Sequence, residues 1–205
     1  MAHGPLYRVP FRRRREGATD YRRRLALLKS GETRVVVRTS NRNVIVQFVA
    51  YDESGDKIVA SAEARELTEL GYPAAGNNTP SAYLTGRLAA KRAKEAGVDT
   101  GVLDLGRASP HKGGVIFGAL KGVVDAGVEV PHGDVLPEEA RWRAEHLGEQ
   151  KAAAFAASYE KIVGQPLPPK AEKPKGKGKP AQGKQEAAPA AKGKPAKEKK
   201  AKTPE

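Results

Sequence analysis

Two runs of arginine near the start of the chain are the residues whose type and spacing point most directly to a chemistry. They are residues 12–15 and 22–24, and an aromatic residue precedes each run, Phe11 and Tyr21. A guanidinium group binds phosphate through a planar fork of donors and stacks on exposed bases, so the pattern favours RNA as the partner. Adjacent guanidinium groups repel one another and little apolar surface is available to bury, so we expect the segment to need a polyanion in order to fold. A solvated basic tail and a nuclear-import signal are the alternatives.

The histidine and serine residues form no recognisable catalytic or metal-binding pattern. The four histidines are scattered without metal-ligand spacing, and the chain has no cysteine that could complete a site or form a disulfide. Ser109 and His111 lie two residues apart, but no strand–turn–helix pattern surrounds Ser109, as a nucleophile elbow requires. We therefore do not expect a hydrolase.

Two further patterns match catalytic motifs incompletely. Residues 178–184 match most of a phosphate-binding P-loop, but Gln185 stands where a serine or threonine would hold magnesium. Asp99 and Asp104 suggest a two-metal nuclease, yet such sites need several convergent carboxylates, and the other predicted strands offer none. The sequence predicts no enzyme, no cofactor and no metal site.

The positive charge is concentrated at the two ends of the chain. The 205 residues carry a net charge of +13, to which residues 1–30 contribute +7, residues 165–205 contribute +8 and residues 31–164 contribute −2. Two basic extensions on a nearly neutral domain are typical of a protein embedded in a nucleic-acid assembly. The lack of cysteine agrees with a reducing compartment, and no apolar run reaches the length of a membrane span or a signal-peptide core. We therefore expect an intracellular protein with no membrane partner.

Three segments rich in β-branched residues predict an antiparallel meander. They are residues 33–38, 44–51 and 57–62, and short turns separate them. The first turn is a polar hairpin tip that carries Arg42. The second turn, residues 52–56, is acidic and opposes contact with RNA, so the Arg42 tip is the better candidate for binding.

The middle of the chain predicts a helix whose start could bind a phosphate. Thr79 can cap this helix while Pro80 occupies its first position. The free amides and amide side chains of residues 76–81 lie at the positive end of the helix dipole, which suits a phosphate. Tyr83 and Arg87 fall in one cationic quadrant of the helix, for which an ordinary solvated face is the alternative.

The next segments predict the second half of an α/β core. Residues 98–105 form a buried strand, parallel to an earlier strand because a helix connects them. A loop of small and basic residues, which includes Lys112, leads to a second helix. Three glycines recur every four residues up to Gly122, from which we infer close packing against a sheet or an RNA backbone. Residues 128–132 add a short edge strand.

The end of the chain predicts two helices and a tail. A third helix, which contains Trp142, starts at Pro137 and breaks near Gly148, and an alanine-rich helix follows over about residues 149–163. From residue 165 the composition collapses to Lys, Pro, Ala, Gly and Gln, which predicts disorder. The predicted organisation is a basic arm (1–30), an α/β core with a mixed sheet flanked by helices (31–132), a C-terminal helical extension (133–164) and a low-complexity basic tail (165–205).

Several blocks of the chain, in this order, resemble a known family. They are residues 7–16 (YRVPFRRRRE), 19–31 (TDYRRRLALLKSG), 37–47 (VRTSNRNVIVQ), 76–86 (GNNTPSAYLTG), 102–106 (VLDLG) and 125–132 (DAGVEVPH). The family is that of the archaeal large-subunit ribosomal protein numbered eighteen, the counterpart of the eukaryotic large-subunit protein numbered five. The resemblance covers about residues 5–150, and beyond it the tail departs from the family pattern.

The resemblance implies an α/β fold with ribonuclease-H-like topology that binds 5S rRNA and anchors it to the large (23S) rRNA in the central protuberance. It further implies neighbouring large-subunit ribosomal proteins as partners, a place in the cytoplasmic ribosome and no small-molecule substrate. A metal-dependent nuclease on the same fold and a chromatin-type DNA-binding protein are the alternatives. The residues predicted to bind RNA, from the residue pattern and the family motifs together, are Tyr7, Arg8, Arg12, Arg13, Arg14, Arg15, Tyr21, Arg22, Arg23, Arg24, Arg38, Ser40, Asn41, Arg42, Asn43, Asn77, Asn78, Thr79, Ser81, Tyr83, Arg87 and Lys112.

Overall fold

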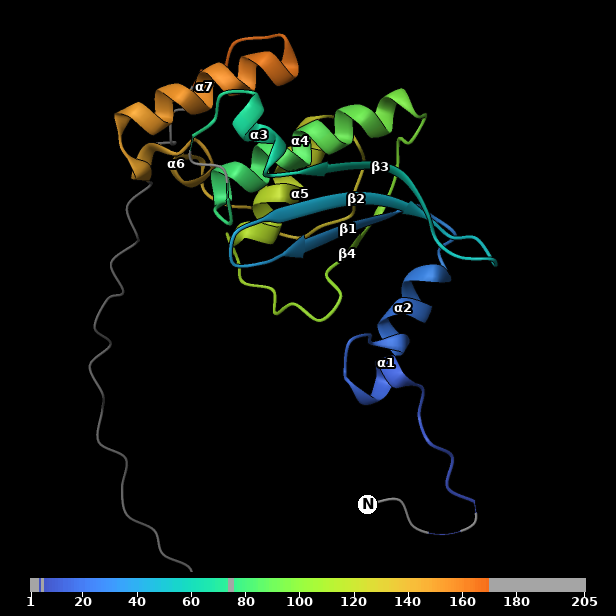
Figure 1. Cartoon of the computed structure of the whole chain (residues 1–205). Coiled ribbons are helices and arrows are strands. Elements are labelled where there is room, and N and C mark those ends of the chain that lie inside the picture. The colour runs from blue at the N-terminus through green and yellow to red at the C-terminus, as the bar shows by residue number, and fades with distance from the viewer. Residues whose placement is uncertain (1–3, 5, 74–75, 170–205) are drawn as a thin grey trace, which may run out of the picture. The chain divides into compact units, whose positions relative to one another are not determined.

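Four strands form one mixed sheet in the computed structural model, which describes residue 4, residues 6–73 and residues 76–169 (Figure 1). The strands are β1 (Arg34–Thr39), β2 (Val44–Ala50), β3 (Lys57–Glu63) and β4 (Val102–Asp104), in the spatial order β3-β2-β1-β4. β2 pairs antiparallel with β1 and with β3, whereas β4 runs parallel to β1. The predicted meander and the predicted parallel strand are therefore confirmed. The likeness to ribonuclease H stays a prediction.

The second half of the core has less strand than the sequence predicts. β4 is much shorter than the predicted strand over residues 98–105. The predicted edge strand at 128–132 is reduced to a single parallel bridge between Thr100 and Glu129.

The helices lie close to their predicted positions from residue 66 onward. They are α3 (Glu66–Glu69), α4 (Thr79–Glu95), α5 (Val115–Asp125), α6 (Glu139–Trp142), a single 3-10 turn η1 (Glu145–Leu147) and α7 (Glu149–Val163). Asn78, not the predicted Thr79, caps α4, since its side-chain oxygen accepts a hydrogen bond from the backbone N–H of Ser81 at 2.8 Å. In the described part of the chain, no helix is both long and apolar enough to cross a membrane.

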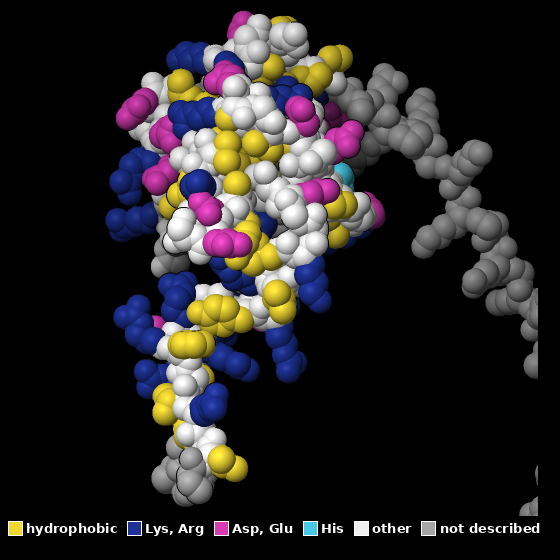
Figure 2. Space-filling model, turned by 90° about the vertical axis from the view of Figure 1, so that its right-hand side faces the viewer, with side chains coloured by type: hydrophobic (Ala, Val, Ile, Leu, Met, Phe, Trp, Pro, Cys, Tyr) yellow, Lys and Arg dark blue, Asp and Glu magenta, His cyan; other side chains and the backbone are white. Residues whose placement is uncertain are grey.

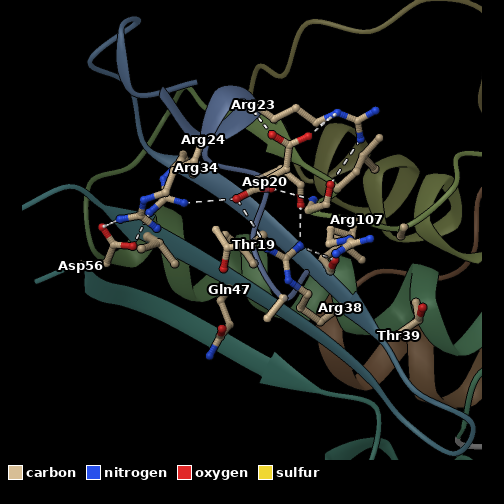
Figure 3. Close-up of a pocket in the computed structure, with 18 of the residues that line it drawn as sticks. Thr19, Asp20, Arg23, Arg24, Arg34, Arg38, Thr39, Gln47, Asp56 and Arg107 are labelled. Atoms are coloured by element: carbon tan, nitrogen blue, oxygen red, sulfur yellow. Dashed lines mark hydrogen bonds and ion pairs between the residues drawn. The ribbon is translucent and has the colours of Figure 1, made fainter. Parts of the chain in front are cut away.

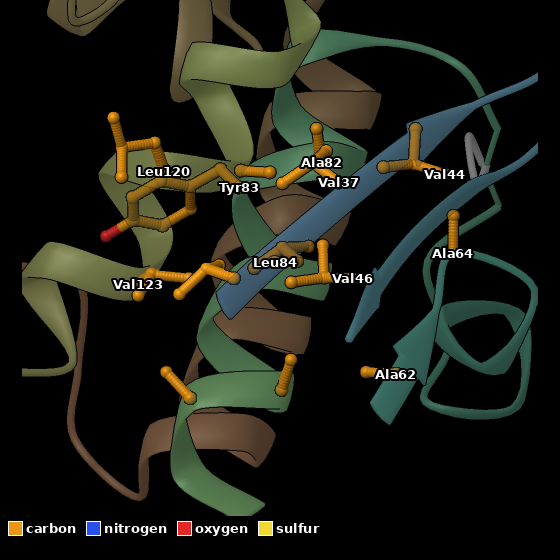
Figure 4. Close-up of a cluster of buried hydrophobic side chains, with 14 of the residues drawn as sticks. Val37, Val44, Val46, Ala62, Ala64, Ala82, Tyr83, Leu84, Leu120 and Val123 are labelled. Carbon is orange, nitrogen blue, oxygen red and sulfur yellow. The ribbon is translucent and has the colours of Figure 1, made fainter. Parts of the chain in front are cut away.

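The two faces of the sheet have different roles because side chains alternate along each strand. Val35, Val37, Val46 and Phe48 lie on one face, are completely buried and pack in the core against α4 and α5. Figure 4 shows Val37 and Val46 opposite Leu84 of α4. No long helix of the described residues covers the other face, which is approached by the segment at the start of the chain (Figure 1).

Helices α4 and α5 approach one another closely through small residues. A Cβ atom at Gly122 would collide with the backbone oxygen of Tyr83, and one at Gly86 would collide with that of Ala119. Gly118 lies against the first turn of α4 in the same way. The glycines of α5 therefore let two helices meet, which corrects the prediction that they face a sheet or an RNA backbone. Close packing offsets the lower helix propensity of glycine.

Helices α6 and α7 add an aromatic layer over α4. The ring of Trp142 stacks on that of Tyr83, with 4.3 Å between the ring centroids. The guanidinium of Arg143 lies 5.0 Å from the Trp142 ring centroid and donates a hydrogen bond to the carbonyl of Pro168 at 2.7 Å. Residues 165–169, which the composition assigns to a disordered tail, are therefore bound to the folded unit. The rest of the predicted tail lies outside the described residues.

We predict that Gly122→Ala lowers the free energy of unfolding by about 1–3 kcal/mol, because overpacking at the α4–α5 contact outweighs the higher helix propensity of alanine. Gly133→Ala is the matched control, since no atom lies within 4 Å of a Cβ built there, and it should leave the stability nearly unchanged. Urea unfolding of the two variants measures both effects. Equal stability of Gly122→Ala and the unaltered chain would contradict the close approach of the two helices.

Candidate nucleic-acid interface

The arm, residues 1–30, contains two short helices that the sequence does not predict. They are α1 (Arg12–Arg15) and α2 (Tyr21–Leu28). Asp20 caps α2, because its side chain accepts hydrogen bonds from the backbone N–H groups of Arg22 and Arg23 at 3.0 and 3.2 Å. Neither helix contains a buried residue. The arm is therefore held to the core by polar contacts and not by an apolar face.

Most cations of the arm project into solvent. In Figure 2 the arm lies at the bottom of the view, where dark-blue Lys and Arg side chains surround yellow apolar ones, and nearly all the magenta acids lie on the body above it. The aromatic residues of the arm are also accessible, since Tyr7 is 48%, Phe11 82% and Tyr21 41% exposed. The arm thus presents exposed cations, which are able to bind phosphate, and exposed rings, on which bases are able to stack.

A chain of charged groups joins α2 to the uncovered face of the sheet (Figure 3). Asp56 accepts hydrogen bonds from Nη2 of Arg24 at 2.8 Å and from Nη2 of Arg34 at 2.6 Å. Nη1 of Arg34 donates to Asp104 at 3.1 Å. Because Arg34 is only 3% exposed, its charge needs partners inside the protein, and the two carboxylates supply them.

The same network reaches the loop that follows β4. The backbone N–H of Gly106 donates to the Asp104 carboxylate at 2.7 Å, and Arg38 donates to the Asp104 carbonyl at 3.0 Å. Nη1 of Arg23 donates to the carbonyl of Gly106 at 3.3 Å, so the loop also touches the arm. Gly106 has a φ of +58°, and the Arg38 guanidinium lies 2.9 Å from where a Cβ would stand. The positive φ favours glycine at this position.

The electrostatics of Asp56 keep this attachment intact at neutral pH. Partial burial works against ionisation, but hydrogen bonds and positive charge from Arg34 and Arg24 outweigh it and hold the pKa of Asp56 below its ordinary value of 3.8. Because the folded pKa is depressed, the contact stabilises the folded state above the ordinary carboxyl pKa and is lost as pH falls through the depressed pKa. The acidic turn, predicted only to oppose RNA, thus holds the arm in place.

The arginines of the arm divide into two groups. Arg23 and Arg24 bind the core, as described above. Arg14, Arg15 and Arg22 are exposed and have no side-chain partner among the described residues. Arg8 is likewise exposed, Arg12 has only a solvent-exposed pair with Glu16 at 3.7 Å, and Nε of Arg13 donates to Thr19. The second group is available for an external anion.

A cavity of about 600 Å³ lies between the arm and the uncovered face of the sheet (Figure 3). We call it the arm cleft. Its floor consists of sheet residues, namely Val36, Gln47, Val49 and Ile58. Helix α2 and residues 105–108 of the loop after β4 form its walls.

A second cavity, of about 310 Å³, adjoins the arm cleft, because Thr39 and Ala108 line both. It brings the end of β1 together with Asn77, just before α4, and with the loop after β4. A Cβ at Gly76 would lie 3.8 Å from the carbonyl oxygen of Arg42, so the start of α4 also lies beside the hairpin tip. The structure therefore brings together the arm, the hairpin and the segment before α4, which the sequence identified separately.

The hairpin residues differ in how much of their side chains is available. Ser40, Asn41 and Arg42 are exposed at the tip. Asn43 is half-buried and donates a hydrogen bond to Glu63 at 3.1 Å. Arg38 keeps 46% of its side chain exposed although it is bound to Asp104. These positions are compatible with contact to an external polyanion.

Three predicted binding residues on α4 lie in the core, so we withdraw them from the interface. Thr79, Ser81 and Tyr83 are 5%, 0% and 1% exposed. The hydroxyl of Tyr83 donates to Asp125 at 3.0 Å, and burial, reinforced by the Asp125 charge, raises the pKa of this hydroxyl. The predicted cationic quadrant is wrong at its aromatic end, because α5, α6 and α7 cover Tyr83, whereas Lys91 and Lys94 further along α4 are exposed. Asn78 is occupied as the cap of α4, and only Asn77 of this group is exposed.

The two remaining candidates lie apart from the arm cleft. The guanidinium of Arg87 lies 5.0 Å from the ring centroid of Tyr159 in the C-terminal aromatic layer. Lys112 is exposed in the loop after β4 and pairs with Asp134. Neither lines the cavities that join the arm to the hairpin.

The sequence missed the residues that attach the arm and form the cleft. The sequence places Arg34, Gln47 and Asp56 in strands and turns and offers Asp104 only as a metal ligand. Nothing in their local spacing shows that they lie together beside the arm. Arg107 also lines the cleft and packs against the turn at Gly17. The only local feature that could have indicated Arg107 as a cleft residue is its position in a loop of small and basic residues.

Comparison with known proteins identifies similar chains. A family model for the ribosomal large-subunit proteins 60S L5 and 50S L18 matches residues 6–100. The large ribosomal subunit protein uL18 of Korarchaeum cryptofilum (strain OPF8) is 53% identical over 161 residues, which are 78% of this chain and 80% of that protein. The match to the family model includes the arm, the meander and α4.

We predict that Asp56→Asn loosens the arm, because it removes the charge that Arg24 and Arg34 share. The free energy of unfolding should fall by about 1–3 kcal/mol, as expected for hydrogen bonds to a charged group. Backbone amides of α2 should exchange hydrogen faster. Asp52→Asn, which removes the partner of the exposed Lys57, is the matched control and should leave exchange in α2 unchanged. Unaltered exchange in Asp56→Asn would show that the network does not hold the arm.

Proposed function

Because the chain belongs to the family of large-subunit ribosomal proteins that includes 60S L5 and 50S L18, we propose that it binds 5S rRNA and anchors it to the large rRNA in the central protuberance. In this role it is a non-enzymatic constituent of the ribosome in the cytoplasm. Its further partners are the 23S rRNA and neighbouring large-subunit ribosomal proteins. The basic tail adds non-specific contact with rRNA.

The main support for the proposal is that some arginines of the arm bind the core while the others are exposed to solvent. Arg24 attaches α2 to Asp56, while Arg14, Arg15 and Arg22 remain exposed. An arm fixed to the core through α2 and cationic elsewhere loses less conformational freedom when it lies along a phosphate backbone than a free tail would. The exposed aromatic residues add stacking platforms for unpaired bases. This combination suits a folded RNA with loops and bulges.

The nuclease alternative finds no support in the geometry. It depends on Asp104 as a metal ligand, but this carboxylate is bound by Arg34 and lies within 3.5 Å of Arg38. Among the residues that the structure describes, no three acids or histidines form a group that could hold a metal ion. A competition experiment, in which duplex DNA and structured RNA compete for the chain, distinguishes the DNA-binding alternative from the proposal. Preference for duplex DNA would favour the alternative.

The salt dependence of binding follows from the available cations. The arm has eight arginines, and two of them are bound to the core. If about six neutralise phosphates, the logarithm of the affinity should fall with the logarithm of salt concentration at a slope of roughly −4 to −5. A fourfold increase in salt would then weaken binding on the order of 10²- to 10³-fold.

We predict that Arg14→Ala, Arg15→Ala and Arg22→Ala each weaken binding to 5S rRNA and flatten the salt slope by somewhat under one unit. Lys151→Ala, which removes an exposed cation from α7, is the matched control and should leave the slope unchanged. Binding is measured over a range of salt concentrations with 5S rRNA and with an unrelated RNA of equal length.

Two results would contradict the proposal. Equal affinity of the unaltered chain for the two RNAs would mean that it acts only as a polycation. An unchanged slope in all three arm variants would mean that the arm does not touch phosphate.

A further inference from the structure

We propose that the arm cleft binds a single unstacked nucleotide, with its base on the floor formed by the sheet and its phosphate at the arginines of the walls. The inference rests on the proposed function, since it states which part of a bound RNA enters this site. It also assigns a role to residues that neither the arginine runs nor the hairpin indicated.

The size and shape of the cleft favour one nucleotide over a duplex. Its volume of about 600 Å³ lies within the range of roughly 300–1,000 Å³ typical of small-molecule sites. A double helix presents a convex surface that cannot enter a cavity between a helix and a sheet. Sequence-specific recognition of RNA instead relies on loop and bulge bases that leave the stack and enter such pockets.

The floor has the chemistry that a base requires. Val36 lies opposite Gln47 in the β1–β2 register, and Val49 lies opposite Ile58 in the β2–β3 register, so the four side chains form one continuous surface. Ile58, which is 56% exposed although it lies on the sheet, offers an apolar surface for the face of a base, while Val36 and Val49 beside it are 7% and 5% exposed and form the buried base of the floor. A ring that covers Ile58 removes its exposed apolar area from water, which is favourable.

Gln47 supplies the polar group that could recognise the edge of the base. Its carboxamide is half-buried at the centre of this floor, and it has no side-chain hydrogen bond with any residue that the structure describes. Figure 3 shows this side chain standing apart from the dashed network of the arginines. A carboxamide carries both a donor and an acceptor, so it can pair with a base edge that presents both. If a ligand removed the Gln47 carboxamide from water without supplying a hydrogen-bond partner, the loss of hydration would be unfavourable.

The walls carry the charge that a phosphate requires. Six arginines and three aspartates line the cleft, so its potential is positive and attracts an anion. Arg107 forms no ion pair with a described residue, although it packs against the turn at Gly17. Arg34 is only 3% exposed, and its Nε has no hydrogen-bond partner among the described residues. The cleft is therefore polarised, with an apolar floor and cationic walls.

A direct test uses the full chain and the four nucleoside 5′-monophosphates as probes. Each is titrated while the side-chain amide of Gln47 and the methyl groups of Val49 are followed by NMR. We expect saturable shifts of both groups. Gln47→Trp, which fills the cleft, should weaken binding at least tenfold, and Gln47→Ala, which leaves it open, should weaken binding about three- to tenfold. Thr68→Trp, on the exposed side of α3, is the matched control. Absence of shifts at Gln47 with all four nucleotides would overturn the inference.

The second test uses 5S rRNA and separates the two proposals. Gln47→Trp should weaken binding at every salt concentration without changing the slope, because a base and not a phosphate is displaced. One base that the unaltered chain protects from chemical modification should become reactive. If the chain prefers 5S rRNA but Gln47→Trp binds equally well with the same protected bases, the inference is wrong and the proposed function stands. If the chain shows no preference for 5S rRNA, the proposed function fails. The nucleotide titration alone then determines whether the arm cleft binds a nucleotide.

Discussion

The guanidinium of Arg34 lies between the carboxylates of Asp56 and Asp104, and the arrangement of the arm depends on this contact. An arginine that is almost fully buried must be paired, and breaking a buried pair is strongly unfavourable because a charge is left without compensation. Each aspartate then has capacity for a second arginine. Asp56 binds Arg24 of the arm, and Asp104 binds Arg38 at the end of β1. One buried charge thus fixes two groups that are far apart in the sequence.

The arrangement explains how a polycationic segment can have a defined place in a folded protein. The arm buries no apolar residue of its own helices, so the hydrophobic effect contributes little to its position. Charge-assisted hydrogen bonds position it instead, and they do so while most of its arginines stay in solvent.

The other face of the sheet is governed by packing. Glycines 86, 118 and 122 let the backbones of α4 and α5 approach one another closely, and α4 also packs against β2 and β3. This approach buries the first turns of α4, including the hydroxyl of Tyr83 that the sequence placed on a cationic surface. Among the described residues, the proposed contacts with RNA therefore lie mainly in the arm, at the hairpin tip and just before α4. The arginines follow the same division: Arg24 and Arg34 pair with carboxylates of the core, whereas Arg14 and Arg15 are exposed to solvent.

The sequence by itself determined the meander, the parallel strand, the long helices and the family, because periodicity, caps and short blocks of identity are local signals. It also indicated the arginines of the arm as an anion-binding group. Only the tertiary structure decided which arginines are accessible, that Thr79, Ser81 and Tyr83 are core residues, and that Gln47 lies on the floor of a cleft. The physical reason is that burial and pairing depend on groups distant in the chain: Arg24 meets Asp56, and Arg34 meets Asp104, only when the sheet has formed. No spacing along the sequence records those contacts.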